Sequence, residues 1–446
     1  MKNSEKYDRL AERESDIVSS MAIIPARQGF TFSEARIKES LSKGQIFNML
    51  SFDRQEGEEN AFTAQIEYQG TEYTFFFYIE STSKLELAEY NYGNMIAKAD
   101  MDKALKQPCA LVVSVYFEDD PLLSFHFQLK VLNAVVPDAA LVLDFASYKL
   151  LSSKWLKMTA KSDVPPSPEY LYAIHAVYND DDENSETKQY WLHTHGLLRC
   201  GLVELEALNI TDGAQQLYDL MTVVVKKFLD EPAKEREKFQ IGYDGLGINL
   251  SWLRWEDAIA DLPDNALGGK NDREGEDNAH TEPSGVLFAV EEDNSLASPQ
   301  IYISSLADNP IYYISNEETL RMSRLAKERF PFFRDVYEKR SLSGKKSLVK
   351  KLLRKKENAS WEFMVKLGLT VDAAAAETER EHLWFEVVEL DGDVIEAKLL
   401  NRPYWISALN EGDTGRYPLE LLTDWIIYSP EGRSYTTDSI YQLGYS

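Results

Sequence analysis

The sequence is poor in cysteine: only Cys109 and Cys200 occur among 446 residues. Two thiols cannot supply a disulfide framework or a four-cysteine zinc site. The stretch at 1–16, MKNSEKYDRLAERESD, is charged throughout and lacks the apolar core of a signal peptide. We therefore expect a protein of a reducing compartment, the cytoplasm.

Long apolar runs and an excess of basic residues are also missing. The longest apolar runs, 110–117 and 220–225, fall well short of the ~18 residues of a spanning helix, so no membrane span is expected. Lys and Arg number 48 against 74 Asp and Glu, which gives a formal net charge of −26. Because such a surface repels phosphate backbones, tight binding to nucleic acid is not expected.

Apolar periodicity indicates the fold class. Residues alternate in polarity from Phe62 to Ile79 around a turn at Gln69-Gly70, which predicts a hairpin. Asp120 before Pro121 predicts the start of a helix, and helices and buried strands alternate around it. We expect an α+β fold, with an N-terminal mixed sheet and packed helices, then a helix-led, mostly antiparallel small barrel or sheet.

Composition also predicts the domain organisation. Residues 1–20 read as a polar tail, and 21–262 as an N-terminal α+β domain. The stretch 263–285 combines Pro, Gly, Asn and acids with almost no apolar residue, which is typical of a linker. Residues 286–446 then form the C-terminal domain.

His193 and His195 are the sharpest chemical signal. On a strand, residues i and i+2 share a face about 6.6 Å apart, a spacing that two metal ligands can use. Glu204 or His175 is a possible third ligand. The competing interpretation is two partly buried histidines that are hydrogen-bonded within a sheet. Since no HExxH motif or clustered Cys/His set accompanies them, the sequence predicts no bound metal.

A second group of candidate binding residues lies near the C-terminus: His382, Trp384, Asn401, Asp424 and Trp425. His382 and Trp384 share a strand face, which favours a ligand pocket or, alternatively, a core tryptophan beside a hydrogen-bonded histidine. Asp424 and Trp425 allow the same two interpretations. Asn401 before Arg-Pro is also typical of a turn.

The segment 339–356 is strongly basic, in contrast to the rest of the chain. Three interpretations remain: it docks on the protein's own acidic surface, it contacts an anionic membrane or nucleic acid, or it binds an acidic partner protein. Its candidate residues are Lys345, Lys346, Lys350, Lys351, Arg354, Lys355 and Lys356.

The region from about Asn316 onward contains motifs in a characteristic order. They are ETLRMSRLAKERFPFF, WEFMVKLGL, EHLWFEV, the turn at 400–403, EGD at 411–413 and TDW at 423–425. In this order they resemble the YegJ-type domain, a bacterial family of unknown function, although the basic insert at 341–356 is longer than the family's usual loop. The stretch Tyr190 to Glu206, YWLHTHGLLRCGLVELE, resembles an associated uncharacterised bacterial family. The resemblance implies a bacterial, intracellular protein and carries no catalytic residues over. Because such domains occur among contact-toxin immunity and stress genes, it also suggests a protein-binding role.

The chain lacks a P-loop, a G-x-S-x-G motif and the kinase motifs, so no cofactor is expected. The leading hypothesis is a non-enzymatic protein that binds another protein, in a regulatory or immunity-like role. The alternative is a metal-dependent hydrolase centred on His193 and His195.

Overall fold

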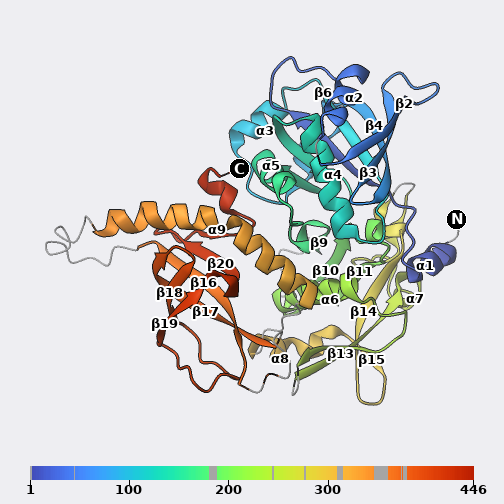
Figure 1. The fold of residues 1–446 in the computed structure, drawn as a ribbon. Helices are drawn as coiled ribbons and strands as arrows, with labels where there is room; N and C mark the ends of the chain where they lie inside the picture. Colours follow the sequence, from blue (N-terminus) through green and yellow to red (C-terminus); the bar gives the residue numbers. More distant parts are fainter. Residues whose placement is uncertain are drawn as a thin grey trace. The chain divides into compact units, whose positions relative to one another are not determined.

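The computed structural model describes residues 3–44, 46–179, 188–243, 246–275, 278–308, 315–345, 360–372, 374 and 379–445. The chain forms two compact units (Figure 1). The first comprises Met1–Leu156 with Ser167–Ile314, and the second comprises Lys157–Pro166 with Ser315–Ser446. Among the described residues, no helix combines the length and the apolar composition needed to cross a membrane.

The first sheet of unit 1, sheet A, has eight strands in the order β2-β3-β4-β6-β1-β7-β8-β5. All neighbours are antiparallel except β5 and β8. The bounds are β1 Ser19–Pro25, β2 Asn48–Arg54, β3 Ala61–Tyr68, β4 Thr71–Ser81, β5 Asn91–Tyr92, β6 Cys109–Val115, β7 Ala139–Asp144 and β8 Lys149–Ser152.

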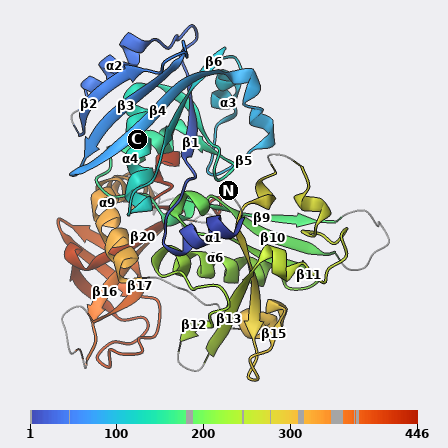
Figure 2. The same ribbon diagram turned by 90° about the vertical axis from the view of Figure 1, so that its right-hand side faces the viewer.

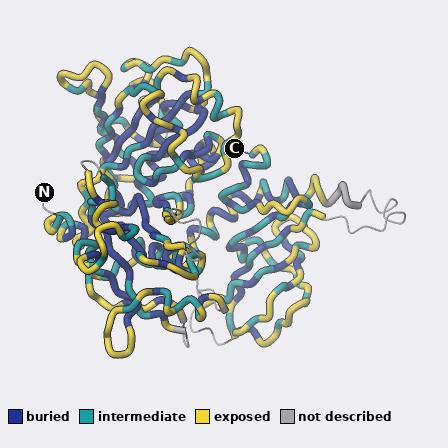
Figure 3. The backbone as a smooth tube through the Cα atoms, turned by 180° about the vertical axis from the view of Figure 1, so that it is seen from behind, coloured by how far each residue is buried: buried dark blue, intermediate teal, exposed yellow. Residues whose placement is uncertain are grey.

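Sheet A is buried on both faces at its centre, which explains the uninterrupted apolar runs of β1, β6 and β7. On one face α4 (Pro121–Val135) inserts Phe127, whose ring stacks on Tyr68 at a centroid distance of 4.3 Å. On the other face α3 (Lys98–Ala104) contributes Ala104 to the core. Figure 3 shows the buried backbone following these strands. The helix at Asp120 is confirmed, because that side chain accepts from the backbone N–H of Leu123 at 2.9 Å.

The remaining helices of unit 1 are short or lie outside the sheets' centres. The hairpin at Gln69-Gly70 is confirmed by the pairing of β3 with β4. Helix α2 (Glu34–Ser42) has Ser33 as its N-cap, and the Ser33 side chain accepts from the N–H of Arg36. The helix bounds are α1 Asn3–Ala11, α2 Glu34–Ser42, α6 Ala214–Asp230, α7 Trp255–Ala258 and α8 Ile303–Asp308, while α5 Ser153–Lys161 begins in unit 1 and ends in unit 2.

The second sheet of unit 1, sheet B, has the strand order β12-β13-β14-β11-β10-β9, with β15 also paired to β14 (Figure 2). Strands β11 and β14 are parallel and the other pairs are antiparallel. The bounds are β9 Ala173–Tyr178, β10 Tyr190–His195, β11 Glu204–Ile210, β12 Phe239–Tyr243, β13 Leu246–Arg254, β14 Ser284–Val290 and β15 Leu296–Ala297.

A buried ion pair links the two sheets of unit 1. Arg199, in the turn η4 (Leu198–Cys200) between β10 and β11, donates to both carboxylate oxygens of Asp144 on β7, each at 2.8 Å. Both side chains are fully buried. Arg199 also donates to the carbonyl of Leu171 at 2.7 Å, so its charge is both paired and hydrogen-bonded.

The stretch expected to be a linker, 263–285, differs in the structure. It lies within unit 1, and its end forms the start of β14 between β11 and β13. Before β14 it contains two short turns, η5 (Asn271–Arg273) and η6 (Ala279–Thr281). Its attachment is polar, through the buried Arg273, which a measure of apolar content does not detect. Residues 1–20 also differ from a polar tail: Tyr7 on α1 is buried, and its hydroxyl donates to the carbonyl of Ser284 at 2.8 Å.

The second unit packs α9 (Asn316–Lys345) against one face of sheet C, whose order is β19-β18-β17-β16-β20-β21. Every strand pair is antiparallel, and the described strands form an open sheet. Trp425 anchors the helix, because its indole N–H donates to the carbonyl of Ala326 at 3.0 Å. The α+β class expected from the sequence is confirmed. The bounds are β16 Glu362–Thr370, β17 Arg380–Asp391, β18 Val394–Leu399, β19 Thr414–Pro418, β20 Leu422–Tyr428 and β21 Ser434–Thr436.

Candidate metal centre

Four of the six histidines in the chain gather at one place in sheet B. His193 and His195 lie on β10, His175 lies on the edge strand β9, and His280 lies on the turn η6. His193 and His195 share a face because they are two residues apart on a strand, as the sequence predicted. The strand register places His175 directly opposite His193, on the same face.

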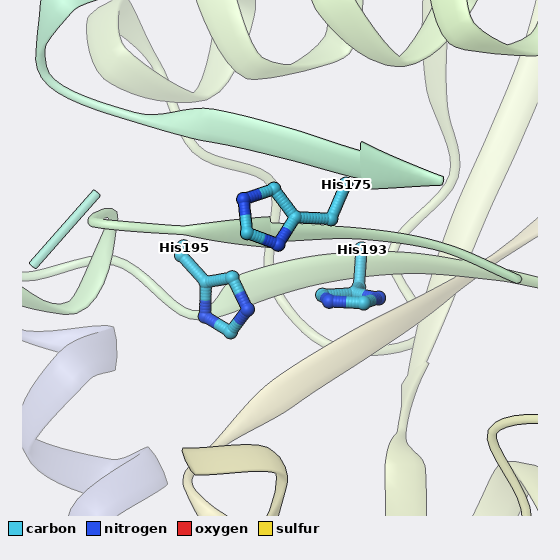
Figure 4. Close-up of side chains that lie close together, drawn as sticks. All are labelled: His175, His193 and His195. Atoms are coloured by element: carbon cyan, nitrogen blue, oxygen red, sulfur yellow. The ribbon is translucent and has the colours of Figure 1, made fainter. Parts of the chain in front are cut away.

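The three strand histidines converge on a common space. One nitrogen from each of His175, His193 and His195 lies within 4.8 Å of the others. Figure 4 shows the three rings pointing toward one another. The ring centroid of His195 is 4.9 Å from that of His193 and 4.9 Å from that of His175. Within the described part of the chain, no other group of three or more His, Cys, Asp or Glu residues has ligand atoms this close together.

The fourth histidine approaches from outside the sheet. The Nε2 atom of His280 is 3.3 Å from the Nε2 atom of His193. Its ring centroid lies 4.7 Å from that of His193 and 5.4 Å from that of His195. His280 therefore borders the same space, although it comes from a segment 85 residues after β10 ends (280 − 195 = 85).

The environment favours neutral imidazoles. Burial, with the neighbouring histidines adding to it, lowers the pKa of His193 to about 2 and that of His195 to about 3. Burial also lowers the pKa of His175 and of His280. The lowered pKa values favour the neutral form of each ring, which carries a lone pair on one ring nitrogen. A metal ion can bind such nitrogens without first displacing a proton.

A buried ion pair between Glu206 and Arg273 lies beside the histidines. Glu206 on β11 is directly opposite His193 in the register. Arg273 donates to both of its carboxylate oxygens, at 3.0 and 2.7 Å, and Trp191 donates to it at 2.7 Å. Ser284 also hydrogen-bonds to this carboxylate. Because its oxygens are occupied in this way, Glu206 holds the surroundings of the histidines in place and is not itself available as a ligand.

The histidine rings are also oriented by their neighbours. The side-chain amide of Asn91 lies 3.4 Å from Nε2 of His175, and the ring of Tyr148 lies 4.7 Å from that of His195. The Nδ1 atom of His193 is buried and has no hydrogen-bond partner among the described residues. Leaving a buried polar atom unpaired costs about 1–3 kcal/mol. This nitrogen is not the Nε2 atom that approaches His280, so an ion bound at Nε2 would leave it unpaired.

Glu204 has a different role from the one considered in the sequence. Its carboxylate accepts from the hydroxyl of Thr194 at 2.6 Å, and from the backbone N–H groups of Gly196, Leu197 and Leu198 at 2.8, 2.9 and 3.2 Å. Thr194 points to the face opposite the histidines. Glu204 therefore stabilises the turn after β10, and of the two candidates for a third ligand the structure places His175 beside the pair.

The candidates of unit 2 form a separate group on sheet C. His382 and Trp384 lie on β17, and Asp424 lies on β20, on the face opposite α9. Nδ1 of His382 is 3.2 Å from the hydroxyl of Thr423, and the backbone N–H of Trp384 donates to Asn401 at 3.2 Å. Burial raises the pKa of Asp424 to about 6.

Two other expectations have simpler outcomes. Trp425 is fully buried between sheet C and α9, so its side chain belongs to the core and not to a surface site. The backbone of Lys345 ends α9, while Lys346, Lys350, Lys351, Arg354, Lys355 and Lys356 lie outside the described residues. The three interpretations of this basic segment stay predictions.

Sequence reasoning missed His280 and the pair formed by Glu206 and Arg273. His280 stands within a stretch of linker composition, where local patterns indicate nothing to pack against. One signal was available: a single arginine and a single histidine stand between Asn271 and Pro283, in a stretch otherwise rich in acids. A buried acidic residue such as Glu206 needs a cation of this kind.

Three regions of the chain match family models. Residues 19–166 match the family described as "Protein of unknown function (DUF4026) N-terminal", and residues 174–288 match its "C-terminal" counterpart. Residues 345–441 match "Uncharacterized protein conserved in bacteria (DUF2314)". The three matched regions follow one another along the chain.

All four clustered histidines lie within the region that matches the C-terminal part of DUF4026, and His382, Trp384 and Asp424 lie within the DUF2314 region. The expectation of domains of unknown function is confirmed, while the YegJ-type assignment stays a prediction. A search of the curated proteins and a search of the solved structures each gave no match.

Proposed function

We propose that unit 1 binds a divalent transition-metal ion through His175, His193 and His195. The observation that carries this proposal is the convergence of three imidazole nitrogens within 4.8 Å on one face of sheet B. Burial favours the neutral form of His193, and a hydrogen-bonded network of neighbours holds the surroundings of the rings in place. A bound ion would coordinate ring nitrogens that burial has removed from water.

The ligand chemistry favours Zn²⁺. Imidazole nitrogens suit Zn²⁺, Cu²⁺, Ni²⁺ and Fe²⁺, whereas Mg²⁺ and Ca²⁺ prefer oxygen ligands. The carboxylates nearest the histidines, Glu206 and Glu204, are already saturated by hydrogen bonds. A site of neutral nitrogens without carboxylate ligands therefore selects against the oxygen-seeking ions and fits the tetrahedral preference of zinc.

Titration of the metal-free full-length chain with Zn²⁺ tests the proposal. We expect about one ion per chain, loss of this binding in His193→Ala and His175→Ala, and unchanged binding in His382→Ala, a control histidine of unit 2. Zinc should also raise the temperature at which unit 1 unfolds, because a ligand that binds only the folded state stabilises it. Absence of stoichiometric binding, or binding that survives both sheet B substitutions, contradicts the proposal.

The hydrolase hypothesis is a stronger version of the same proposal. Three histidines with an open fourth position can hold a metal-bound water whose pKa is lowered toward 7, which makes it a nucleophile. This chemistry requires that the fourth position stays free for water and substrate. Whether it does depends on His280.

A second candidate function, protein binding, is favoured by a separate surface of unit 2. Tyr404 and Trp405 are 88% and 70% exposed, which is unusual for adjacent large aromatic residues. Their backbone N–H groups are held by the carboxylate of Glu381 at 2.7 and 3.0 Å. Together with Arg402 they border a cavity of about 410 Å³. Arg, Tyr and Trp are the residue types that dominate binding at protein interfaces.

We propose on this basis that unit 2 binds another protein of the bacterial cytoplasm, in a regulatory or immunity-like role. The test places a photo-crosslinking residue beside Trp405 in the native host and compares Trp405→Ala and Tyr404→Ala with Tyr92→Ala. Tyr92 is 59% exposed in unit 1 and serves as the control. A defined partner should crosslink to the parent chain and to the control but not to the two aromatic variants. Crosslinking that is equal in all three variants contradicts this candidate.

A further inference from the structure

We propose that His280 is a fourth ligand, and that metal binding fastens the described residues 263–275 and 278–283 over the histidine face of sheet B. The inference rests on the proposed metal site and extends it, because it describes how the site is closed and what the ion controls. The ion would hold a chain segment in place, and no coordination position would remain for catalysis.

The distance between His193 and His280 supports this assignment. Zinc–nitrogen bonds of about 2.0–2.1 Å at tetrahedral angles place two ligand nitrogens about 3.3–3.4 Å apart. The Nε2 atoms of His193 and His280 are 3.3 Å apart. The two rings are nearly perpendicular, at 84°, so they meet at this point without stacking. This spacing matches one edge of a zinc tetrahedron, and without an ion it is also the distance of a hydrogen bond between the two rings. His280 stands outside the group of three whose ligand atoms all lie within 4.8 Å of one another, so its ring must turn toward His175 and His195 to complete the tetrahedron.

The backbone of the segment is positioned to present His280. The carbonyl of His280 accepts from Arg273 at 2.9 Å, and Arg273 is the partner of Glu206. The N–H of His280 donates to Asn278 at 3.0 Å. The backbone carbonyl and N–H of His280 are therefore both held by hydrogen bonds, and its side chain points toward His193.

A second contact attaches the segment near its start. Gly268 has a φ of +73°, and a Cβ there would lie 2.9 Å from the ring of Trp191. The same indole donates to Glu206, while the guanidinium of Arg273 lies 5.5 Å from the ring centroid. Gly268 and Arg273 thus provide two attachments of the segment to the sheet. An ion bound by the half-buried ring of His280 would provide a third attachment.

A closed set of four histidines changes the expected chemistry. Structural zinc sites are four-coordinate with protein ligands alone, whereas catalytic sites keep a position for water. With His280 in place the fourth position is filled, so the centre stabilises a conformation and does not activate water. The chain after His280 leads directly into β14, which lies between β11 and β13. The ion would therefore hold the start of β14 and the residues before it against sheet B.

Ligand counting on the full-length chain is the first part of the test. X-ray absorption of the zinc-loaded parent chain should show four imidazole nitrogens, and the Co²⁺-loaded chain should have the intense visible bands of a four-coordinate site. In His280→Gln one nitrogen should be lost and the Co²⁺ bands should weaken as water enters. The zinc affinity should fall by at least the roughly 10- to 100-fold that loss of an outer-shell partner causes. Because the parent chain's spectrum counts the ligands by itself, the result does not depend on the stability of the variant.

Hydrogen exchange is the second part. Zinc should slow amide exchange in the peptide covering 263–283 of the parent chain, and should leave this exchange unchanged in His280→Gln. His382→Gln is the matched control and should behave as the parent does. If the parent chain binds no zinc, the proposed metal site itself fails. If zinc binds with three nitrogens, and His280→Gln keeps the parent's affinity and exchange pattern, only the fourth ligand is refuted and the open site of the hydrolase hypothesis is favoured.

Discussion

Sheets B and C both carry a strand on which a histidine and a second aromatic ring stand two residues apart. In sheet B these are His193 and His195, and in sheet C they are His382 and Trp384. Their surroundings differ because the residues opposite them differ. His193 faces His175, whereas His382 faces Gly368. The spacing along a strand therefore gives only half of a site, and the neighbouring strand determines whether ligands converge.

Sheets B and C also differ in how their buried ionisable groups are stabilised. In sheet B the carboxylate of Glu206 is paired with Arg273, burial raises the pKa of the hydrogen-bonded Glu204, and burial lowers the pKa of the histidines. In sheet C the carboxyl group of Asp424 is half-buried, and burial raises its pKa to about 6. Each sheet therefore carries a carboxyl group whose ionisation opposes folding, but in sheet B the carboxylate of Glu204 accepts four hydrogen bonds and that of Glu206 has a counter-ion.

The largest effect on this comparison should come from Arg273→Met. Removing the guanidinium leaves the carboxylate of Glu206 buried without its counter-ion, which typically costs about 3–5 kcal/mol of unfolding free energy. The measurement is urea unfolding of the metal-free chain, followed by pulse labelling of the β10 and β11 peptides and mass spectrometry.

The control for this prediction is an exposed ion pair of sheet C. Arg416 and Asp391 lie 2.8 Å apart with 58% and 74% of their side chains exposed, so Arg416→Met should cost about 0–1 kcal/mol. The double variant Glu206→Gln/Arg273→Met should recover part of the loss, because no unpaired charge remains. Equal losses from Arg273→Met and Arg416→Met would show that the pair in sheet B contributes no more than a surface contact.

The second prediction concerns pH and Asp424→Asn. The folded pKa of Asp424, about 6, lies above its ordinary value of 3.8, so the folded state holds this proton more tightly than the unfolded state does. The contribution of this group to stability is therefore most favourable below about pH 4 and declines as pH rises to about 6. The decline is at most about 3 kcal/mol, at 1.36 kcal/mol for each pKa unit. Asp424→Asn should remove this decline and stabilise unit 2 at about pH 8.

The groups that face Asp424 define the control for this pH effect. Lys366 and Arg321 lower its pKa and Asp438 raises it, but burial is the largest cause. Urea unfolding read at the β20 peptide should therefore show a difference between parent and variant that grows between about pH 4 and about pH 6 and is then constant. A difference that is independent of pH would mean that Asp424 ionises normally in the folded chain.

Several elements of this comparison follow from the sequence because they are local. The shared face of His193 and His195 follows from strand alternation. The antiparallel pairings of β9 with β10 and of β17 with β18 join strands that are neighbours along the chain, the second pair across a turn at Gly392. These features depend on residues that are close in the chain, and hydrophobic alternation is sufficient to define them.

The rest depends on contacts between distant segments. His280 reaches His193 because β14 pairs in parallel with β11 and because Arg273 pairs with Glu206, 67 residues away. Neither interaction has a local apolar signature, so the stretch 263–285 reads as a linker although it carries a candidate ligand. The position of the boundary between the units, at Ile314 and not near 285, has the same cause.

The smallest effect should come from a pair of matched tryptophan substitutions, Trp191→Phe in sheet B and Trp384→Phe in sheet C. The indole of Trp191 donates to the buried carboxylate of Glu206 at 2.7 Å, whereas no acceptor for the indole of Trp384 is found in the part of the chain that the structure describes. Trp191 is 3% exposed whereas Trp384 is half-buried, so Trp191→Phe loses more packing as well as the hydrogen bond. Because Glu206 keeps Arg273 and Ser284 as donors, the hydrogen bond itself should contribute only about 1 kcal/mol to the difference from Trp384→Phe. Urea unfolding of each unit measures the two losses, and an equal or larger loss from Trp384→Phe would mean that the polar network of sheet B does not depend on its tryptophan.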